Sequence, residues 1–278
     1  MHRFARILRS AARIATLALA ATGMTGAVRA QGDLLVAPTR VIVNGGGSTE
    51  VVLNNIGATP ATYRIALELR RMTPDGELET IETDQATAEE KAMLDAVRYA
   101  PRRIVLPPNQ PQSVRISVRP GETMTDGEYR VHMSFRAIPD ARPVEAAPAP
   151  EATGLSIRLT PIYGISIPVI LRKGALDAGA RIAQAGLVRE GGDAFLKLDL
   201  ERTGKRSVYG EIRVMAPGAK QPAYLVRGVA IYPELARRSL QLALSPAQAA
   251  AIKGPMTVEY REMPEAGGKL IASTSATF

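Results

Sequence analysis

Few side chains in this sequence could carry out acid–base or nucleophilic chemistry. There is no cysteine, and the only histidines are His2 and His132. A hydrolase built on a serine, a histidine and an acid would therefore depend wholly on His132, and a histidine-rich metal site is excluded. His132 alternates with Val131 and Met133. We therefore expect it on the outer, solvated face of a strand rather than in the role of a catalytic base.

Catalytic motifs are missing as well. The sequence has no Gly-x-Ser-x-Gly elbow, no Gly-Lys-Ser/Thr phosphate loop and no His-Glu-x-x-His pair. Glu89 and Glu90 are adjacent, and neighbouring residues on a helix point in different directions, so they do not form a glycosidase pair. We expect no enzyme, no catalytic residue, no cofactor and no metal. A carbohydrate-active sandwich enzyme remains an alternative, and it would need two carboxylates about 5–10 Å apart in a groove.

Residues 1–30 have the pattern of a secretory signal peptide. Four arginines between positions 3 and 13 precede an apolar stretch at 14–21, and Ala-Val-Arg-Ala at 27–30 fits a cleavage site before Gln31. The apolar stretch is too short to span a bilayer. Because this segment carries five arginines and no acid, its removal lowers the formal charge from +8 to +3. We therefore expect an exported protein without nucleic-acid binding and without membrane insertion of the mature chain.

The rest of the chain is dominated by short alternating strands separated by Asn, Gly and Pro, which is typical of antiparallel sandwiches. The fold class we expect is all-β, with two immunoglobulin-like sandwiches at a fixed angle and a cleft between them. The first domain is expected at 31–171, with a short helix near 86–97 and a long loop at 140–154. The second is expected at 172–278 after a connector of only a few residues.

Asp126-Gly-Glu-Tyr129 opens one of the strands of the first domain. This arrangement resembles the tyrosine corner of immunoglobulin-like domains, in which the tyrosine hydroxyl bonds to upstream backbone. Period-two alternation places Tyr129, Val131, Met133 and Phe135 together on the inner face.

The segment 155–171 is a second distinctive feature. Leu155, Ile157 and Leu159 alternate with polar residues and follow the Pro- and Ala-rich stretch 140–154. An apolar strand next to an irregular loop can be lent to a partner protein. The alternative is that these three side chains pack in the core of the chain itself.

Several pieces of the first domain are similar to the periplasmic pilus-assembly chaperones, the PapD-like family, and suggest a divergent branch of it. The resemblance covers residues 33–171, whereas 172–278 shows only strand patterning. The pieces are Val36-Ala-Pro-Thr-Arg-Val-Ile-Val-Asn-Gly45, Val52-Leu-Asn-Asn55, Tyr99-Ala-Pro-Arg-Arg-Ile-Val-Leu-Pro-Pro108, Ser113-Val-Arg-Ile116 and Phe135-Arg-Ala-Ile-Pro139.

This resemblance implies a chaperone that binds pilus or fimbrial subunits in the periplasm and delivers them to an outer-membrane usher. Leu155, Ile157 and Leu159 would fill the groove of an incomplete subunit sandwich, which is donor-strand complementation. Whether the free chaperone caps this strand by self-association stays open. The alternative from another class is a secreted structural or adhesin protein with two β-sandwich domains.

The resemblance also implies an anchor for the C-terminal carboxylate of the subunit. Arg40 stands at the position of the family's first-strand arginine, but the lysine that accompanies it is missing from Pro161 to Pro168. Tyr163 would take its place, or Arg40 would act alone. Glu128 matches an acidic residue that the family uses between domains. The arginine expected opposite it falls near Ile167, so no role is assigned to Glu128.

Overall fold

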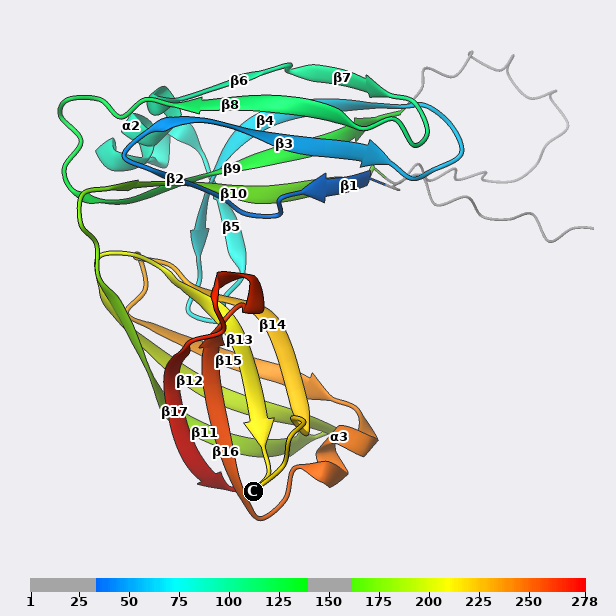
Figure 1. Cartoon of the computed structure of the whole chain (residues 1–278), viewed down its shortest axis with the longest axis vertical. Helices are drawn as coiled ribbons and strands as arrows, with labels where there is room; N and C mark the ends of the chain where they lie inside the picture. The colour runs from blue at the N-terminus through cyan, green and yellow to red at the C-terminus, as the bar shows by residue number, and fades with distance from the viewer. Residues whose placement is uncertain (1–33, 140–161) are drawn as a thin grey trace, which may run out of the picture.

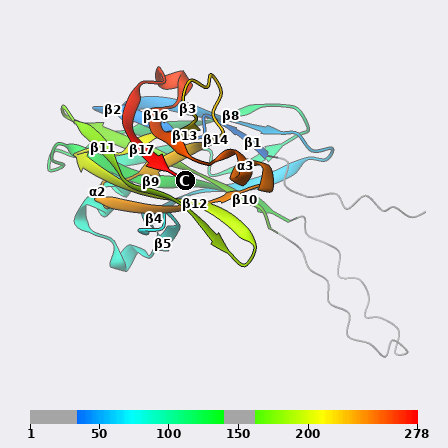
Figure 2. The ribbon, with the colours of Figure 1, turned by 90° about the horizontal axis from the view of Figure 1, so that it is seen from below.

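The computed structural model describes residues 34–139 and 162–278, which form two β-sandwiches that meet at an angle, with the first across the top of the view and the second extending down from it (Figure 1). Seen along the long axis, the second sandwich overlaps the first, so it lies below the first rather than beside it (Figure 2). The expected fold class is thereby confirmed. The expected signal peptide (1–30), the loop 140–154 and Leu155, Ile157 and Leu159 lie outside the described residues. Within the described ranges, no helix is long and apolar enough to cross a membrane.

The first domain packs two sheets face to face. One sheet has the order β1-β3-β8-β6, and the other has the order β2-β10-β9-β4-β5, with β7 also paired to β4. Its strands are β1 (Leu34–Ala37), β2 (Val41–Asn44), β3 (Gly47–Asn55), β4 (Ala61–Met72), β5 (Leu78–Ile81), β6 (Val97–Ala100), β7 (Arg103–Leu106), β8 (Gln112–Val118), β9 (Gly127–Ile138) and β10 (Gly164–Lys173). Thr83–Gln85 forms the short 3-10 turn η1.

The core of the first domain follows the period-two pattern. Tyr129, Val131, Met133 and Phe135 are all buried. The Tyr129 hydroxyl donates to the carbonyl oxygen of Thr125 at 2.8 Å, which confirms the tyrosine corner. Helix α2 (Ala88–Ala96) lies within the range 86–97 expected as helix, and it begins with a capping box in which Thr87 and Glu90 satisfy each other's backbone N–H groups.

The second domain is also a two-layer sandwich. Its sheets have the orders β11-β12-β15 and β14-β13-β16-β17. Its strands are β11 (Ala178–Glu190), β12 (Asp193–Gly204), β13 (Val208–Met215), β14 (Tyr224–Ile231), β15 (Arg237–Leu244), β16 (Pro255–Glu262) and β17 (Leu270–Thr277). The short helix α3 (Pro246–Ala251) and the 3-10 turn η2 (Pro264–Ala266) connect strands. Buried Leu196, Ile212, Val258 and Tyr260 fill the space between the sheets.

The junction between the domains is held by packing as well as by a short connector. Strand β10 runs to Lys173, past the expected boundary at 171, because Arg172 and Lys173 still pair with β9. Only four residues, 174–177, separate β10 from β11. The β4–β5 hairpin reaches down to the second domain (Figure 1), where the Ser239 N–H donates to the Pro74 carbonyl at 2.8 Å.

A separate apolar cluster is buried at this junction. It consists of Met72 and Ile170 from the first domain and Ala230 and Tyr232 from the second. Each large apolar side chain that loses its contact with water contributes about 1.5–3 kcal/mol. The cluster therefore supports the fixed angle expected from the short connector.

Candidate functional site: an open strand edge and a pocket between the domains

Strand β10 has one edge that is only partly covered. It pairs with β9 from Gly164 to Lys173, whereas β2 pairs with it only from Val169 to Arg172. Among the described residues, the stretch 164–168 therefore has no partner strand on the side of β2. Unpaired N–H and C=O groups on a strand edge can accept a strand from another chain.

Two backbone hydrogen bonds fix which residues face this open side. The Arg172 carbonyl accepts from Gly45 N–H at 2.7 Å on the β2 side, and the Tyr163 carbonyl accepts from Ala137 N–H at 3.0 Å on the β9 side. Because backbone groups of successive strand residues point in alternate directions, Gly164 and Ser166 present their N–H and C=O groups to the open side. The edge runs toward Pro168.

Arg40 lies at the inner end of this edge. Val41 pairs with Val169, so the parallel register brings Arg40 beside Pro168. Both residues line a cavity of about 260 Å³ between the domains. The further lining residues that matter here are Met72 and Gly76 from the first domain and Tyr209, Tyr232 and Arg238 from the second. No aspartate or glutamate is among the described residues that line this cavity.

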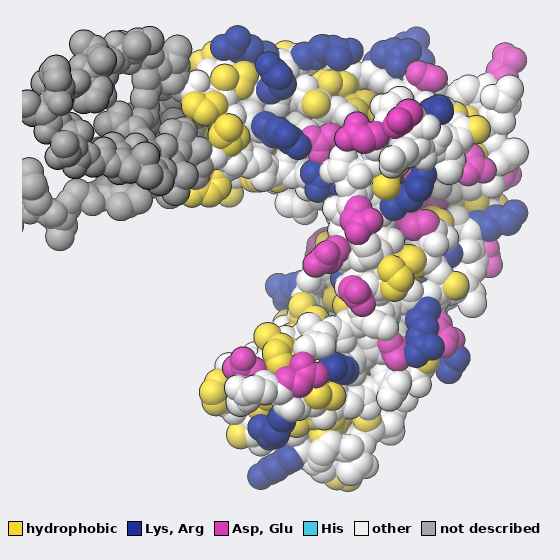
Figure 3. All heavy atoms as spheres, turned by 180° about the vertical axis from the view of Figure 1, so that it is seen from behind, with side chains coloured by type: hydrophobic (Ala, Val, Ile, Leu, Met, Phe, Trp, Pro, Cys, Tyr) yellow, Lys and Arg dark blue, Asp and Glu magenta, His cyan; other side chains and the backbone are white. Residues whose placement is uncertain are grey.

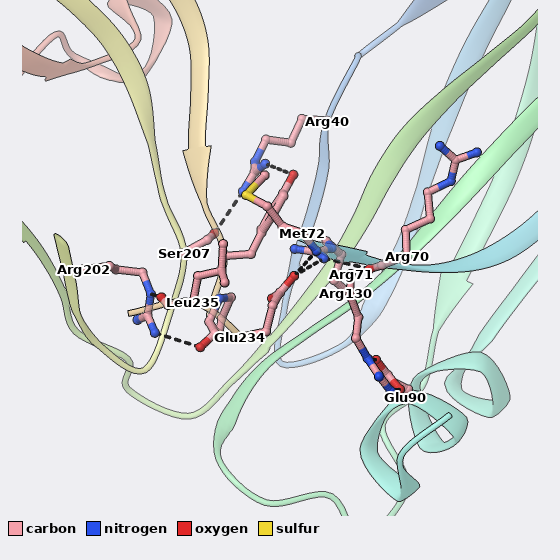
Figure 4. A network of polar contacts seen from close by, with 12 residues as sticks. Arg40, Arg70, Arg71, Met72, Glu90, Arg130, Arg202, Ser207, Glu234 and Leu235 are labelled. Carbon is pink, nitrogen blue, oxygen red and sulfur yellow. Dashed lines mark hydrogen bonds and ion pairs between the residues drawn. The ribbon is translucent and has the colours of Figure 1, made fainter. Parts of the chain in front are cut away.

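The Arg40 guanidinium is held by neutral groups of the second domain. Its Nη1 donates to the Tyr232 hydroxyl at 3.1 Å and its Nη2 to Ser207 Oγ at 3.0 Å (Figure 4). The guanidinium also lies over the Tyr209 ring, 4.6 Å from its centroid. Hydroxyls and ring faces orient a cation without neutralising it, so Arg40 keeps a full positive charge for an incoming anion.

Tyr163 is not brought together with Arg40. Tyr163 immediately precedes β10 and lies five residues before Pro168. This corresponds to roughly 16 Å along a strand. Tyr163 is 46% exposed at the outer end of the edge, next to Ile162, which is 62% exposed. The expected pairing of Arg40 with Tyr163 therefore finds no support in the geometry. Figure 3 shows hydrophobic side chains gathered at this end of the first domain.

The expectation that His132 is solvated is wrong. His132 lies on the outer face of β9, as the alternation predicts, but it is only 1% exposed. In the register it stands between Pro168 of β10 and Glu68 of β4. Burial, followed by the positive charges of Arg130, Arg70 and Arg40, lowers its pKa to about 3. At neutral pH this histidine is therefore an uncharged part of the junction.

Glu128 has a partner that the sequence did not identify. Its side chain is fully buried, and its Oε2 accepts from Arg172 Nε at 2.9 Å. Arg172 stands directly opposite Glu128 in the β9–β10 register, whereas the expected partner near Ile167 lies five positions away. The antiparallel pairing of β9 with β10 identifies this partner, whereas the domain boundary expected at 171 leaves Arg172 outside the first domain.

The ion pair between Arg130 and Glu234 crosses between the domains. Glu234 Oε1 accepts from Arg130 Nη2 at 2.6 Å and from the Met72 N–H at 3.0 Å (Figure 4). The Arg130 side chain is only 7% exposed, and its guanidinium stacks on the Tyr232 ring, 3.4 Å from the centroid. Sequence reasoning missed this pair because its members are about a hundred residues apart and share no motif.

Metal ligands do not gather anywhere in the part of the chain that the structure describes: no group of three or more His, Asp or Glu residues is placed to hold an ion. The arrangement that does stand out combines an open strand edge with an arginine pocket at its end. Chemically, it can pair with the backbone of an added strand and bind an anion at the inner end of that strand.

No family model and no curated protein matches the sequence. Among solved structures, the chain is similar to the YadV chaperone, with 13% identity, coverage of 88% of this chain and 100% of that one, and a TM-score of 0.47. It is similar to the E. coli chaperone DraB, with 14% identity, coverage of 88% and 96%, and a TM-score of 0.46. A chain from the complex of the Salmonella enterica SafA pilin with the SafB chaperone has 16% identity, coverage of 90% and 98%, and a TM-score of 0.45.

Proposed function

We propose that this protein is a periplasmic chaperone that binds pilus or fimbrial subunits by donor-strand complementation and delivers them to an outer-membrane usher. The observation that carries the proposal is the open edge of β10, with unpaired backbone from Gly164 to Pro168 that ends at Arg40. A subunit with an incomplete sandwich has unpaired edges that would otherwise aggregate, and an added strand satisfies them.

In this proposal three parts of the chain contact the subunit. Leu155, Ile157 and Leu159 fill the groove of the subunit, each contributing about 1.5–3 kcal/mol when buried. The edge at Gly164 and Ser166 supplies backbone hydrogen bonds. Arg40 binds the C-terminal carboxylate of the subunit, because a charge-assisted bond to a guanidinium sets the register as well as the affinity.

Co-purification tests the proposal. The tagged protein is isolated from the periplasm of its native host, and the proteins bound to it are identified and quantified by mass spectrometry. We expect a subunit with an incomplete sandwich to be recovered. Its yield should fall at least about tenfold with Arg40→Ala, since one charge-assisted hydrogen bond contributes roughly 1.5–3 kcal/mol. Ile157→Gln should lower it further.

Arg115→Ala is the matched control, because Arg115 is exposed on the opposite sheet of the same domain. It should leave the yield unchanged. Urea denaturation of each free variant separates binding from folding. Equal subunit recovery with Arg40→Ala, or unfolding of the free Ile157→Gln variant, would contradict the roles assigned to these residues. Recovery of the chain in its own fibres would instead favour the structural or adhesin function.

A further inference from the structure

Arg238 is an arginine of the second domain that has no acidic partner among the described residues. Its Nη1 donates to the Ala230 carbonyl at 2.6 Å, and its Nε is buried without a hydrogen-bond partner. Among the residues that the structure describes, it forms no ion pair. Burial lowers the pKa of its guanidinium, but an arginine remains charged at any physiological pH. A buried charge without a counter-ion is costly to the fold.

The hairpin of the first domain is shaped around this guanidinium. Gly76 lies at the tip of the β4–β5 hairpin with a φ of +90°, and a Cβ atom there would come within 2.1 Å of Arg238 Nε and Nη2. Any other residue would both strain the backbone and displace the arginine. Gly76 therefore allows Arg238 to reach the pocket that Arg40 lines from the other side.

Arg40 and Arg238 together give the pocket an unbalanced charge. They come from different domains, and within the described ranges the Nε of each is buried without a hydrogen-bond partner. The other polar side chains of the pocket that bear on this argument are the neutral Tyr209 and Tyr232. One small anion between the two guanidiniums would offset the cost of burying both charges, since Arg and carboxylate groups form strong charge-assisted hydrogen bonds.

We propose that the pocket binds one carboxylate group between Arg40 and Arg238, so that the second domain supplies the second cation of the anchor. Pro168 of β10 stands beside Arg40. Because proline has neither a charged side chain nor an N–H, β10 contributes no cation at this point. The inference rests on the proposed function for the source of the carboxylate, which is the C-terminus of a bound subunit. Because its two donors belong to different domains, the anchor depends on the angle between them.

An NMR titration of the free protein tests this inference. The Nε–Hε signals of Arg40 and Arg238 are followed in 15N-labelled protein during addition of N-acetylglycine. The neutral N-acetylglycinamide serves as the matched ligand, and inorganic phosphate as the second anion. We expect both arginine signals to shift saturably with N-acetylglycine and to stay in place with the amide.

Two variants complete the test. Arg238→Gln should weaken the binding of N-acetylglycine roughly tenfold, the effect of one lost charge-assisted hydrogen bond. Arg237→Gln is the control, because Arg237 is 56% exposed and pairs with Asp199 at 2.5 Å on the outer surface. It should bind as the native protein does. If Arg238→Gln does not fold, Arg238→Lys provides the measurement, since lysine keeps the charge but loses the planar fork.

Three results would overturn the inference. The first is a shift of the Arg40 signal alone, and the second is native affinity in the Arg238 variant. The third is phosphate binding as tight as that of N-acetylglycine, which would make the pocket a general anion site. The outcome of the co-purification does not depend on the outcome of the NMR titration. A carboxylate bound by both arginines without any recovered subunit would refute the proposed function and leave the two-domain anion site standing.

Discussion

The junction between the two domains has two sides on which the arginine side chains have different partners. On one side, Arg172 pairs with buried Glu128 at 2.9 Å, and Arg130 pairs with Glu234 at 2.6 Å. On the other side, Arg40 and Arg238 face tyrosines, a serine and a backbone carbonyl.

The difference separates two uses of the same side chain. Where a guanidinium meets a carboxylate within the chain, its charge is already compensated, and its role is structural. Arg172 and Glu128 join two strands of the first domain, whereas Arg130 and Glu234 join the two domains. Where it meets only neutral groups, its orientation is fixed but its charge is still available. The first side therefore concerns the stability of the junction, and the second concerns what the junction can bind.

The largest effect that can sharpen this comparison is expected from Glu128→Ala. Glu128 is fully buried against Arg172, so its removal leaves a largely buried arginine without a counter-ion, at a cost of about 3 kcal/mol. Urea denaturation measures the loss. The control is Glu201→Ala, which breaks an exposed pair with Arg181 and should cost at most about 1 kcal/mol. Equal losses would show that burial at the junction is not what makes the Glu128 pair important.

A smaller effect is expected from pH, through His132. Its pKa is about 3 in the folded chain and about 6.5 in the unfolded one. The unfolded state therefore takes up a proton first as the pH falls. The stability that neutral His132 contributes is complete above about pH 6.5 and is lost as the pH falls toward 3. Between pH 7 and pH 5 the native protein should lose about 2 kcal/mol more than His132→Gln. Identical slopes of unfolding free energy against pH in the two proteins would rule this out.

The smallest effect is expected on the pocket side, from Ser207→Ala. Ser207 is 1% exposed and accepts from Arg40, but Arg40 retains its bond to Tyr232. The free energy of unfolding should fall by only about 1 kcal/mol, as measured by urea denaturation. A loss as large as that of Glu128→Ala would mean that Arg40 holds the domains together and is not kept available for an anion.

The alternation of residues predicted the strands and their inner faces, since burial on one side of a sheet requires a period of two. The same pattern placed His132 on the outer face but could not say that the face is covered there. That information depends on the tertiary structure, which also brings Arg70 and Arg40, both distant in sequence, close enough for their charges to lower the pKa of His132.

The anchor was predictable only in part. The resemblance to a family position predicts Arg40, and the structure places it in a pocket between the domains. Arg238 carries no signal in the sequence, because its place depends on the hairpin tip at Gly76 and on the angle of the second domain. The sequence suggests Tyr163 only by its position between Pro161 and Pro168, whereas the register places it at the opposite end of the edge from Arg40.

Pro168 gives the open edge of β10 a defined end. It lies where the N–H of an ordinary residue would face the open side, but proline has no N–H to donate. A strand added alongside Gly164 and Ser166 therefore finds no further donor beyond them, and Arg40 stands at that point. For the proposed function, we therefore expect a bound subunit strand to adopt a single register, with its last residue at the pocket.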